Sequence, residues 1–330
     1  MFLVCALHSD EFGLWTNIGA NPASQAIHSI WHNFSYMGVN LFMLITGYCC
    51  IHSQWRLSRY ILLYLQVVFY STGYIILMLL LPFQSTDLVW QTVIQHCIDI
   101  PFAGGYWYFT TYTGLFFLIP FLNKLLLSLN DTQFKSLATT SILVFSILNT
   151  GSHAYIAQHG QNLIWMITCY ILGAYIRTTN IPGSPSTWFT LFLVSLSACT
   201  AINHLIPVLN RDYTALVFVF SCISIFISLS KLQIRSSRIS SILAWAAPLS
   251  FGVYLFHTHP LMWAFVARIA LRIAYSLDFS WYCWIIIPCS IYLTGTGVNW
   301  IRAYLFRKAD IHQFAEKTSG ILTRMARKLL

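Results

Sequence analysis

Two basic sites near the N-terminus have residue types suited to chemistry. His8 ends a run of seven apolar or small residues and precedes Ser9-Asp10-Glu11. An imidazole titrates near neutral pH, so His8 could act as a general base toward a hydroxyl group or could be an interfacial histidine bonded to a neighbour. Arg56 and Arg59 are three residues apart and would point to one side of a helix. Such a pair could bind phosphate oxygens bidentately, or could be ordinary basic residues flanking a membrane helix.

Polar groups also interrupt apolar runs farther along the chain, where they would be costly at membrane depth. The residues concerned are Asn40 and Thr46, Trp107 and Tyr112, and His257. Asn40 could pack helices together as readily as it could line a substrate path. The aromatic residues around Trp107 could form an interfacial belt, but hydroxyl groups among them are denser than a belt needs. His257 is followed by His259 and Pro260, and a proline loosens the helical backbone beside it.

The composition indicates which kind of secondary structure must position these residues. Of 330 residues, 57% are hydrophobic and 8% are charged, and the mean hydropathy is +0.66. Soluble domains carry about 25% charged residues, so the chain is predicted to be an all-α, polytopic membrane helix bundle. We expect about ten spans, at residues 1–8, 35–52, 60–82, 105–122, 136–151, 162–178, 187–207, 213–230, 247–267 and 281–301.

The distribution of basic residues predicts the orientation of these spans. With the C-terminal tail in the cytoplasm, fifteen of the 18 Lys and Arg residues fall on the inner side. The positive-inside rule then places both termini in the cytoplasm of a multi-pass inner-membrane protein. Residues 1–301 would form the membrane domain, and residues 302–330 a basic amphipathic cytoplasmic tail on the anionic inner leaflet.

The outer loops carry acidic and histidine residues, among them Asp10, Glu11, His28 and His32. These residues could be scattered solvated groups or a polar vestibule for a hydroxyl-rich substrate. The chain has no CxxC pair and no Cys/His spacing typical of zinc, so the sequence predicts no metal site. The nine cysteines are expected to be small buried apolar residues.

Taken in order, these segments resemble the acyltransferase-3 family of integral-membrane acyltransferases, which O-acylate cell-surface glycans. The matching segments are His8, Val39–Tyr48, Arg56 with Arg59, Tyr106–Phe109 with Tyr112 and Pro120, and Gly252–His257 with Pro260. Each motif alone is weak, but five in the family's order on a ten-helix topology are fairly specific.

The resemblance implies that an acyl group, usually acetyl, passes from cytoplasmic acyl-CoA to a hydroxyl of a surface polysaccharide or of its lipid-linked precursor. It implies that Arg56 and Arg59 hold CoA phosphates and that His8 acts as the base, either on the acceptor hydroxyl or in passing the acyl group along. His257 would handle a second proton or pack the bundle. Asn40, Thr46, Trp107 and Tyr112 would line the substrate path. The expected partners are the bilayer, a glycan acceptor and acyl-CoA as cosubstrate, with no bound cofactor and no nucleic acid.

The chain departs from the family pattern in two places. Family members carry an arginine upstream of the first-span histidine, whereas only seven residues precede His8. At about 1.5 Å per residue these reach roughly 10 Å of the ~30 Å hydrocarbon core, so we expect a truncated first span. Thr46 replaces the usual serine but keeps its hydroxyl.

A transporter or flippase of a glycan or lipid is the alternative, since it would also have about ten helices with polar groups inside them. It would not need the Arg56 and Arg59 pair or a first-span histidine. A structural membrane anchor fits poorly, because histidines within spans would then be an unexplained cost.

Overall fold

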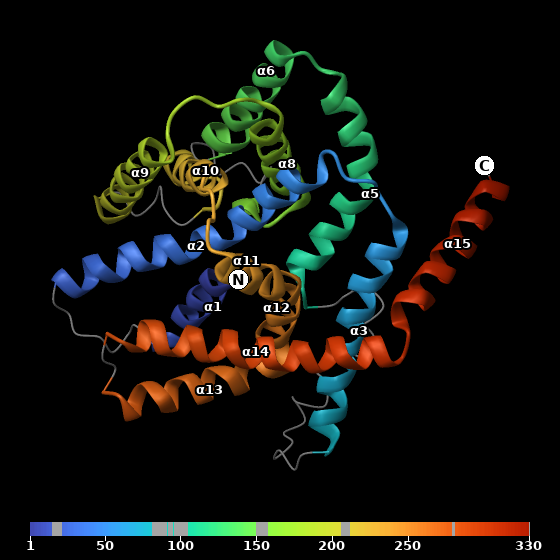
Figure 1. Cartoon of the computed structure of the whole chain (residues 1–330). Coiled ribbons are helices and arrows are strands. Elements are labelled where there is room, and N and C mark those ends of the chain that lie inside the picture. The colour runs from blue at the N-terminus through green and yellow to red at the C-terminus, as the bar shows by residue number, and fades with distance from the viewer. Residues whose placement is uncertain are drawn as a thin grey trace. The chain divides into compact units, whose positions relative to one another are not determined.

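The computed structural model describes residues 1–14, 22–80, 91, 95, 105–149, 158–205, 212–278 and 281–329. Within these ranges the regular elements are all helices, which confirms the predicted all-α fold (Figure 1). The helices are α1 (Phe2–Ser9), η1 (Asp10–Leu14), α2 (Pro22–Cys50), α3 (Leu57–Leu80), α5 (Trp107–Ser128), α6 (Asp131–Ile142), η3 (Leu143–Ile147), η4 (Gln158–Gly160), α8 (Leu163–Thr178), α9 (Pro185–Leu205), α10 (Leu216–Ser230), α11 (Ser237–Ala246), η6 (Ala247–Leu249), α12 (Ser250–Thr258), α13 (Pro260–Ser276), α14 (Cys283–Lys308) and α15 (Ile311–Leu329).

Five helical stretches among the described residues are long and apolar enough to cross a membrane. They are Leu57–Leu77, Trp107–Ser128, Pro185–Leu205, Ser237–Thr258 and Cys283–Lys308. Two shorter apolar helices, α8 and α10, accompany them. The protein is therefore a helical membrane bundle, while the count of ten spans stays a prediction.

The chain forms two compact units. The α2 unit comprises Phe2–Gln54 and Thr111–Ser237, and the α14 unit comprises Met1, Trp55–Thr110 and Arg238–Leu330. Helix α5 passes from one unit to the other after Thr110.

The centre of the α2 unit is a close crossing of α2 and α8 at two glycines. A Cβ atom on Gly47 would lie 2.1 Å from the carbonyl oxygen of Tyr170. A Cβ atom on Gly173 would lie 2.1 Å from the carbonyl oxygen of Leu44. Membrane helices pack at small residues because the two backbones can then approach. The sequence of α2 and α8 therefore allows a backbone-to-backbone contact that other residues would prevent.

In the α14 unit, α12 packs against α14 at Gly252. A Cβ atom there would lie 2.0 Å from Cγ of Asn299. The buried amide of Asn299 donates to the Leu249 carbonyl at 2.8 Å and accepts from Nε of Arg302 at 2.8 Å and from the Tyr70 hydroxyl at 3.3 Å. These bonds join α3, η6 and α14, and they satisfy polar groups that would be costly if left unpaired in an apolar interior.

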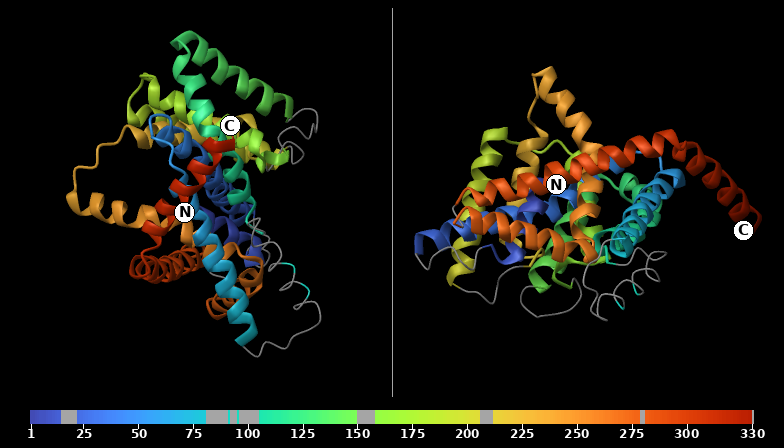
Figure 2. Two further views of the ribbon diagram at one scale, coloured as in Figure 1. Left: turned by 90° about the vertical axis from the view of Figure 1, so that its right-hand side faces the viewer. Right: turned by 90° about the horizontal axis from the view of Figure 1, so that it is seen from below.

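The span predicted over residues 247–267 is interrupted in the structure. The helical stretch that ends with α12 stops at Thr258, His259 is extended at φ −63° and ψ 129°, and α13 starts at Pro260. A proline disfavours the helical conformation in the residue before it and suits the first position of a new helix. Figure 2 shows α13 lying alongside α14, with which it is in contact.

The predicted basic tail contains an amphipathic helix. Helix α14 continues past Arg302 to Lys308, so the change of direction comes later than the predicted boundary at residue 302. Asp310 takes a positive φ of 49°, and α15 follows and packs on α3. The apolar side chains of Phe314, Ile321 and Met325 are exposed along it. This pattern suits the interface of an anionic membrane, and the cytoplasmic side stays a prediction.

Candidate functional site

The residues predicted to act in the site divide between the two units. His8, Asn40, Thr46 and Tyr112 belong to the α2 unit, and Arg56, Arg59, Trp107 and His257 belong to the α14 unit. Each group is therefore described within its own unit.

His8 lies in the last turn of α1, and its side chain is only partly buried. The preceding residues Cys5, Ala6 and Leu7 are buried, and α1 packs on α2, where a Cβ atom on Gly38 would lie 3.1 Å from Leu3. The apolar run thus fixes the helix, while the imidazole at its end remains accessible.

Asn40 joins three segments of the α2 unit. Its side chain is 1% exposed, its Oδ1 accepts from Nε1 of Trp165 at 3.0 Å, and its Nδ2 donates to the Tyr213 carbonyl at 2.8 Å. This geometry favours the packing interpretation of Asn40. Thr46 donates to the carbonyl of Phe42 on its own helix at 2.9 Å. A role of Asn40 or Thr46 in a substrate path stays a prediction.

Tyr112 lies near the start of α5 with a partly exposed ring, 6.3 Å from the ring of Phe116. Farther along the same helix, Asn123 donates to the carbonyl of Cys50 at 2.8 Å and accepts from the hydroxyl of Tyr170 at 2.5 Å. These bonds attach α5 to the end of α2 and to α8. They hold the part of α5 that lies three turns beyond Tyr112.

Arg56 and Arg59 lie at the beginning of α3, and both are exposed. The amide of Arg59 donates to the Arg56 carbonyl at 3.1 Å, so the pair forms the first turn of the helix. The N-terminus of a helix has unsatisfied N–H groups and a partial positive charge, and it favours anions. Two guanidinium groups there add to that positive charge, and a bound anion would offset both.

Trp107 starts α5, between two tyrosines that contact α12. The hydroxyl of Tyr106 donates to the Leu255 carbonyl at 2.9 Å, and the ring of Tyr108 lies 6.1 Å from that of Tyr254. Trp107 itself is partly exposed and lies beside Tyr108. The beginning of α5 is therefore placed against the helix that carries His257.

His257 is completely buried at 0% exposure. Its Nδ1 donates to the carbonyl of Val253, one turn earlier, at 2.6 Å. An imidazole bonded in this way stabilises its own helix. Of the two roles predicted for His257, this environment favours packing of the bundle.

The sequence interpretation missed the surroundings of His259. This residue is 1% exposed and lies at the break between α12 and α13. Its ring centre is 4.9 Å from that of Tyr74 and 5.6 Å from that of Tyr106. The three aromatic side chains come from α3, the start of α5 and the break, and only the fold brings them together.

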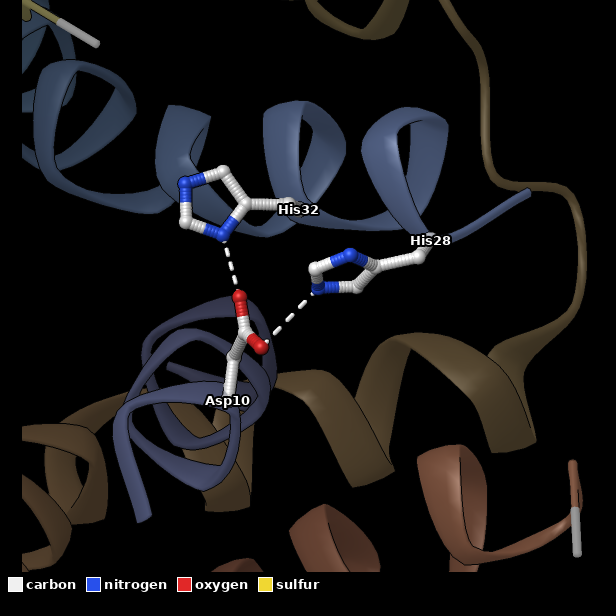
Figure 3. Close-up of side chains that lie close together, drawn as sticks. All are labelled: Asp10, His28 and His32. Atoms are coloured by element: carbon white, nitrogen blue, oxygen red, sulfur yellow. Dashed lines mark hydrogen bonds and ion pairs between the residues drawn. The ribbon is translucent and has the colours of Figure 1, made fainter. Parts of the chain in front are cut away.

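A second group that the sequence interpretation left as loop residues comprises Asp10, His28 and His32. An ionised carboxylate only accepts hydrogen bonds. Nε2 of His28 donates to Oδ1 of Asp10 at 3.0 Å, and Nδ1 of His32 donates to Oδ2 (Figure 3). The sequence interpretation began the second span at residue 35, whereas α2 begins at Pro22. The i, i+4 spacing of two histidines on one helix face was the available signal.

The charges around this group are set by its hydrogen bonds. Burial alone would raise the pKa of the Asp10 carboxyl, but the bonds from His28 and His32 and their positive charge lower the pKa below its usual value. Burial and the charge of Asp10 raise the pKa of the adjacent Glu11. The pKa values of the two neighbouring carboxyls are therefore shifted in opposite directions.

Comparison with protein families identifies the chain. The family model described as an acyltransferase domain, that of the acyltransferase-3 family, matches residues 1–295. Comparison with curated proteins and with solved structures gives no match. The match includes every residue predicted to act in the site, and it covers most of the chain. The protein is a membrane acyltransferase-like chain that belongs to the acyltransferase-3 family.

Proposed function

We propose that this protein transfers an acyl group, acetyl by the habit of the family, from cytoplasmic acyl-CoA to a hydroxyl of a cell-surface polysaccharide or of its lipid-linked precursor. The observation that carries the proposal is the family match over residues 1–295, since it supports a membrane acyltransferase. The accessible imidazole of His8 and the exposed arginine pair at the start of α3 support the assignment of roles. The proposed location is the inner membrane, with both termini in the cytoplasm.

In the proposed reaction, His8 takes the proton from the acceptor hydroxyl as its oxygen attacks the thioester carbonyl carbon of acyl-CoA. The new C–O bond forms, the C–S bond breaks, and the proton passes from His8 to the departing CoA sulfur. Arg56 and Arg59 bind the phosphates of CoA. Thr46, Trp107 and Tyr112 are proposed to line the substrate path, each within its own unit, whereas the buried Asn40 packs the α2 unit. Acyl-CoA is a cosubstrate that leaves as free CoA.

An assay with purified protein separates this reaction from transport by a flippase. Acetyl-CoA labelled in its acetyl group is supplied together with extracted surface glycan and lipid-linked precursor. An acyltransferase releases the CoA thiol and leaves the label attached to glycan in equal amounts. A transporter would move glycan or lipid across vesicles without cleaving the thioester. Absence of acceptor-dependent thiol release would contradict the proposed function.

Replacement of Arg56 and Arg59 by lysine tests the phosphate assignment. Lysine keeps the charge that sets topology but cannot pair bidentately with phosphate. The apparent affinity for acyl-CoA should fall by about 1–3 kcal/mol for each lost contact, which is roughly 5–150-fold. The measurement is the acyl-CoA concentration dependence of transfer at unchanged expression.

Arg235 and Arg238 supply a matched control for this experiment. They have the same spacing, they are both exposed, and they precede or begin α11. Their replacement by lysine should leave the acyl-CoA dependence unchanged. Unaltered dependence in the Arg56→Lys, Arg59→Lys double variant would return that pair to a role in topology alone.

A further inference from the structure

We infer that Asp10, His28 and His32 form a binding site for one divalent transition-metal ion of zinc-like preference. The three side chains come from η1 and from two successive turns of α2. One ligand atom of each lies within 4.8 Å of the other two. Figure 3 shows both imidazoles directed at the single carboxylate between them.

The ligand set matches the chemistry of zinc. Zn²⁺ is bound by imidazole nitrogen and carboxylate oxygen at about 2.0–2.2 Å, and three protein ligands with an open fourth position are typical of catalytic zinc sites. Tetrahedral ligands at those distances lie about 3.3 Å apart, so Nε2 of His28, at 3.0 Å from the carboxylate, is already close to its place. An ion would replace the two imidazole protons that His28 and His32 donate to Asp10.

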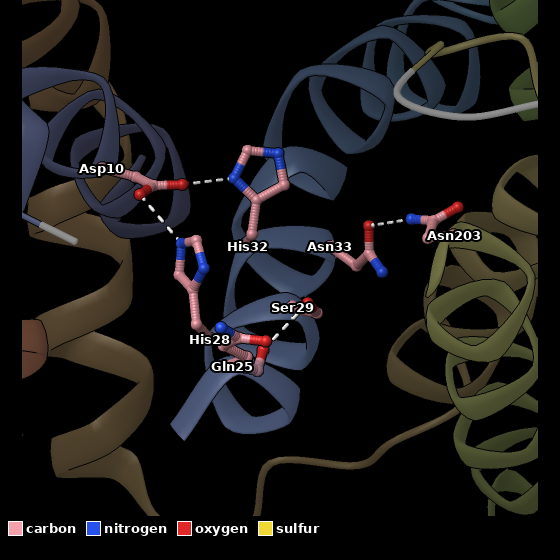
Figure 4. A network of polar contacts seen from close by, with 7 residues as sticks. All are labelled: Asp10, Gln25, His28, Ser29, His32, Asn33 and Asn203. Atoms are coloured by element: carbon pink, nitrogen blue, oxygen red, sulfur yellow. Dashed lines mark hydrogen bonds and ion pairs between the residues drawn. The ribbon is translucent and has the colours of Figure 1, made fainter. Parts of the chain in front are cut away.

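The backbone that presents the two imidazoles is held from its other side. Asn33, next to His32, donates to Oγ1 of Thr200 at 3.1 Å and accepts from Nδ2 of Asn203 at 2.9 Å. These contacts attach this part of α2 to α9, opposite the histidines (Figure 4). A site on a rigid helix that is fixed by further hydrogen bonds holds its ligands in a defined geometry.

Exposure and charge also suit a small cation. The side chains of His28, His32 and Asp10 are 30%, 18% and 11% exposed, so an ion can enter while most of its shell is protein. In the part of the chain that the structure describes, the ion pairs of Asp10 are with the two histidines and not with a lysine or arginine.

The experiment uses the full chain, purified in detergent and stripped with a chelator. Zn²⁺ alone is titrated by calorimetry, and Co²⁺ alone by visible absorption, which reports the ligand geometry. We expect one saturable equivalent per chain. Asp10→Asn, His28→Gln and His32→Gln should each weaken binding by at least about 10–100-fold. That is the usual loss when a residue that only hydrogen-bonds to a metal ligand is removed. The exposed His52 and His312 supply controls, since His52→Gln and His312→Gln should bind like the parent protein.

A stability measurement on the parent protein tests the inference even if the variants fold poorly. An ion that binds only the folded chain raises the melting temperature, so excess Zn²⁺ should stabilise the parent protein and not the three site variants. Absence of a saturable one-to-one site in the parent protein would overturn the inference. Equal affinity in the parent protein and in Asp10→Asn would also overturn it, and would leave a hydrogen-bonded triad without a metal.

Discussion

Replacement of His8 by alanine should reduce acyl transfer by about 10²–10⁴-fold, the usual effect of removing a general base. The imidazole lies in the last turn of α1 and is partly exposed, so its removal leaves the buried face of that helix intact. The variant should therefore reach the membrane at the level of the parent protein. The measurement is glycan acylation per amount of folded protein in isolated membranes.

His257→Ala provides the contrast to this experiment. His257 is completely buried and is bonded to the Val253 carbonyl, so its loss should lower the amount of folded protein more than the activity per folded molecule. Near-normal acylation by the His8→Ala variant would remove His8 from the mechanism. Normal folding with lost activity in His257→Ala would instead give His257 the proton-handling role.

Replacement of Gly47 by alanine should destabilise the α2 unit by about 3 kcal/mol or more. Overpacking of a core by extra carbon atoms commonly costs about 1–3 kcal/mol. Here the new Cβ atom would lie 2.1 Å from the Tyr170 carbonyl oxygen, which belongs to the backbone of α8 and cannot rotate away. Gly173→Ala should have the same effect from the other side of the crossing. Thermal unfolding of the detergent-solubilised variants, followed by the loss of monodisperse protein, measures the effect.

Two other helical glycines make this test specific. A Cβ atom on Gly73 or on Gly297 would have no neighbouring atom within 4 Å. Gly73→Ala and Gly297→Ala should therefore keep or slightly raise the stability, since glycine is a poor residue inside a helix. Equal losses in all four variants would show that the crossing of α2 and α8 does not determine the outcome.

Sequence patterns predicted the apolar helices well where polar caps mark their ends. The predicted span at 162–178 corresponds to α8 at Leu163–Thr178, because the side chain of Asn162 accepts from the Trp165 amide at 3.0 Å and starts the helix there. The predicted span at 213–230 corresponds to α10 at Leu216–Ser230, although Ala215 gives this helix no side-chain cap. Hydropathy is a local property. It therefore found the segments that are apolar enough to lie in a membrane, where the backbone must bond within its own helix.

The extension of α2 back to Pro22 could not be found in this way. Residues 25–33 are polar enough to look like a loop, and their contacts are with η1 and α9, which lie far away in the sequence. The same reason hid the Asp10, His28 and His32 group and the amide contacts of Asn40. Such groups depend on which helices become neighbours, and spacing along one segment does not contain that information.

The hydrogen bonds of Asn40 impose an order on synthesis and insertion. Its partner Trp165 follows 125 residues later, and Tyr213 follows 173 residues later. At 5–20 residues per second, these partners leave the ribosome roughly 6–25 s and 9–35 s after Asn40. Until then the amide of Asn40 in the nascent chain lacks the partners that satisfy it in the folded protein, at a cost in an apolar environment. Helix α2 can therefore complete its packing only after more than half of the chain has been made.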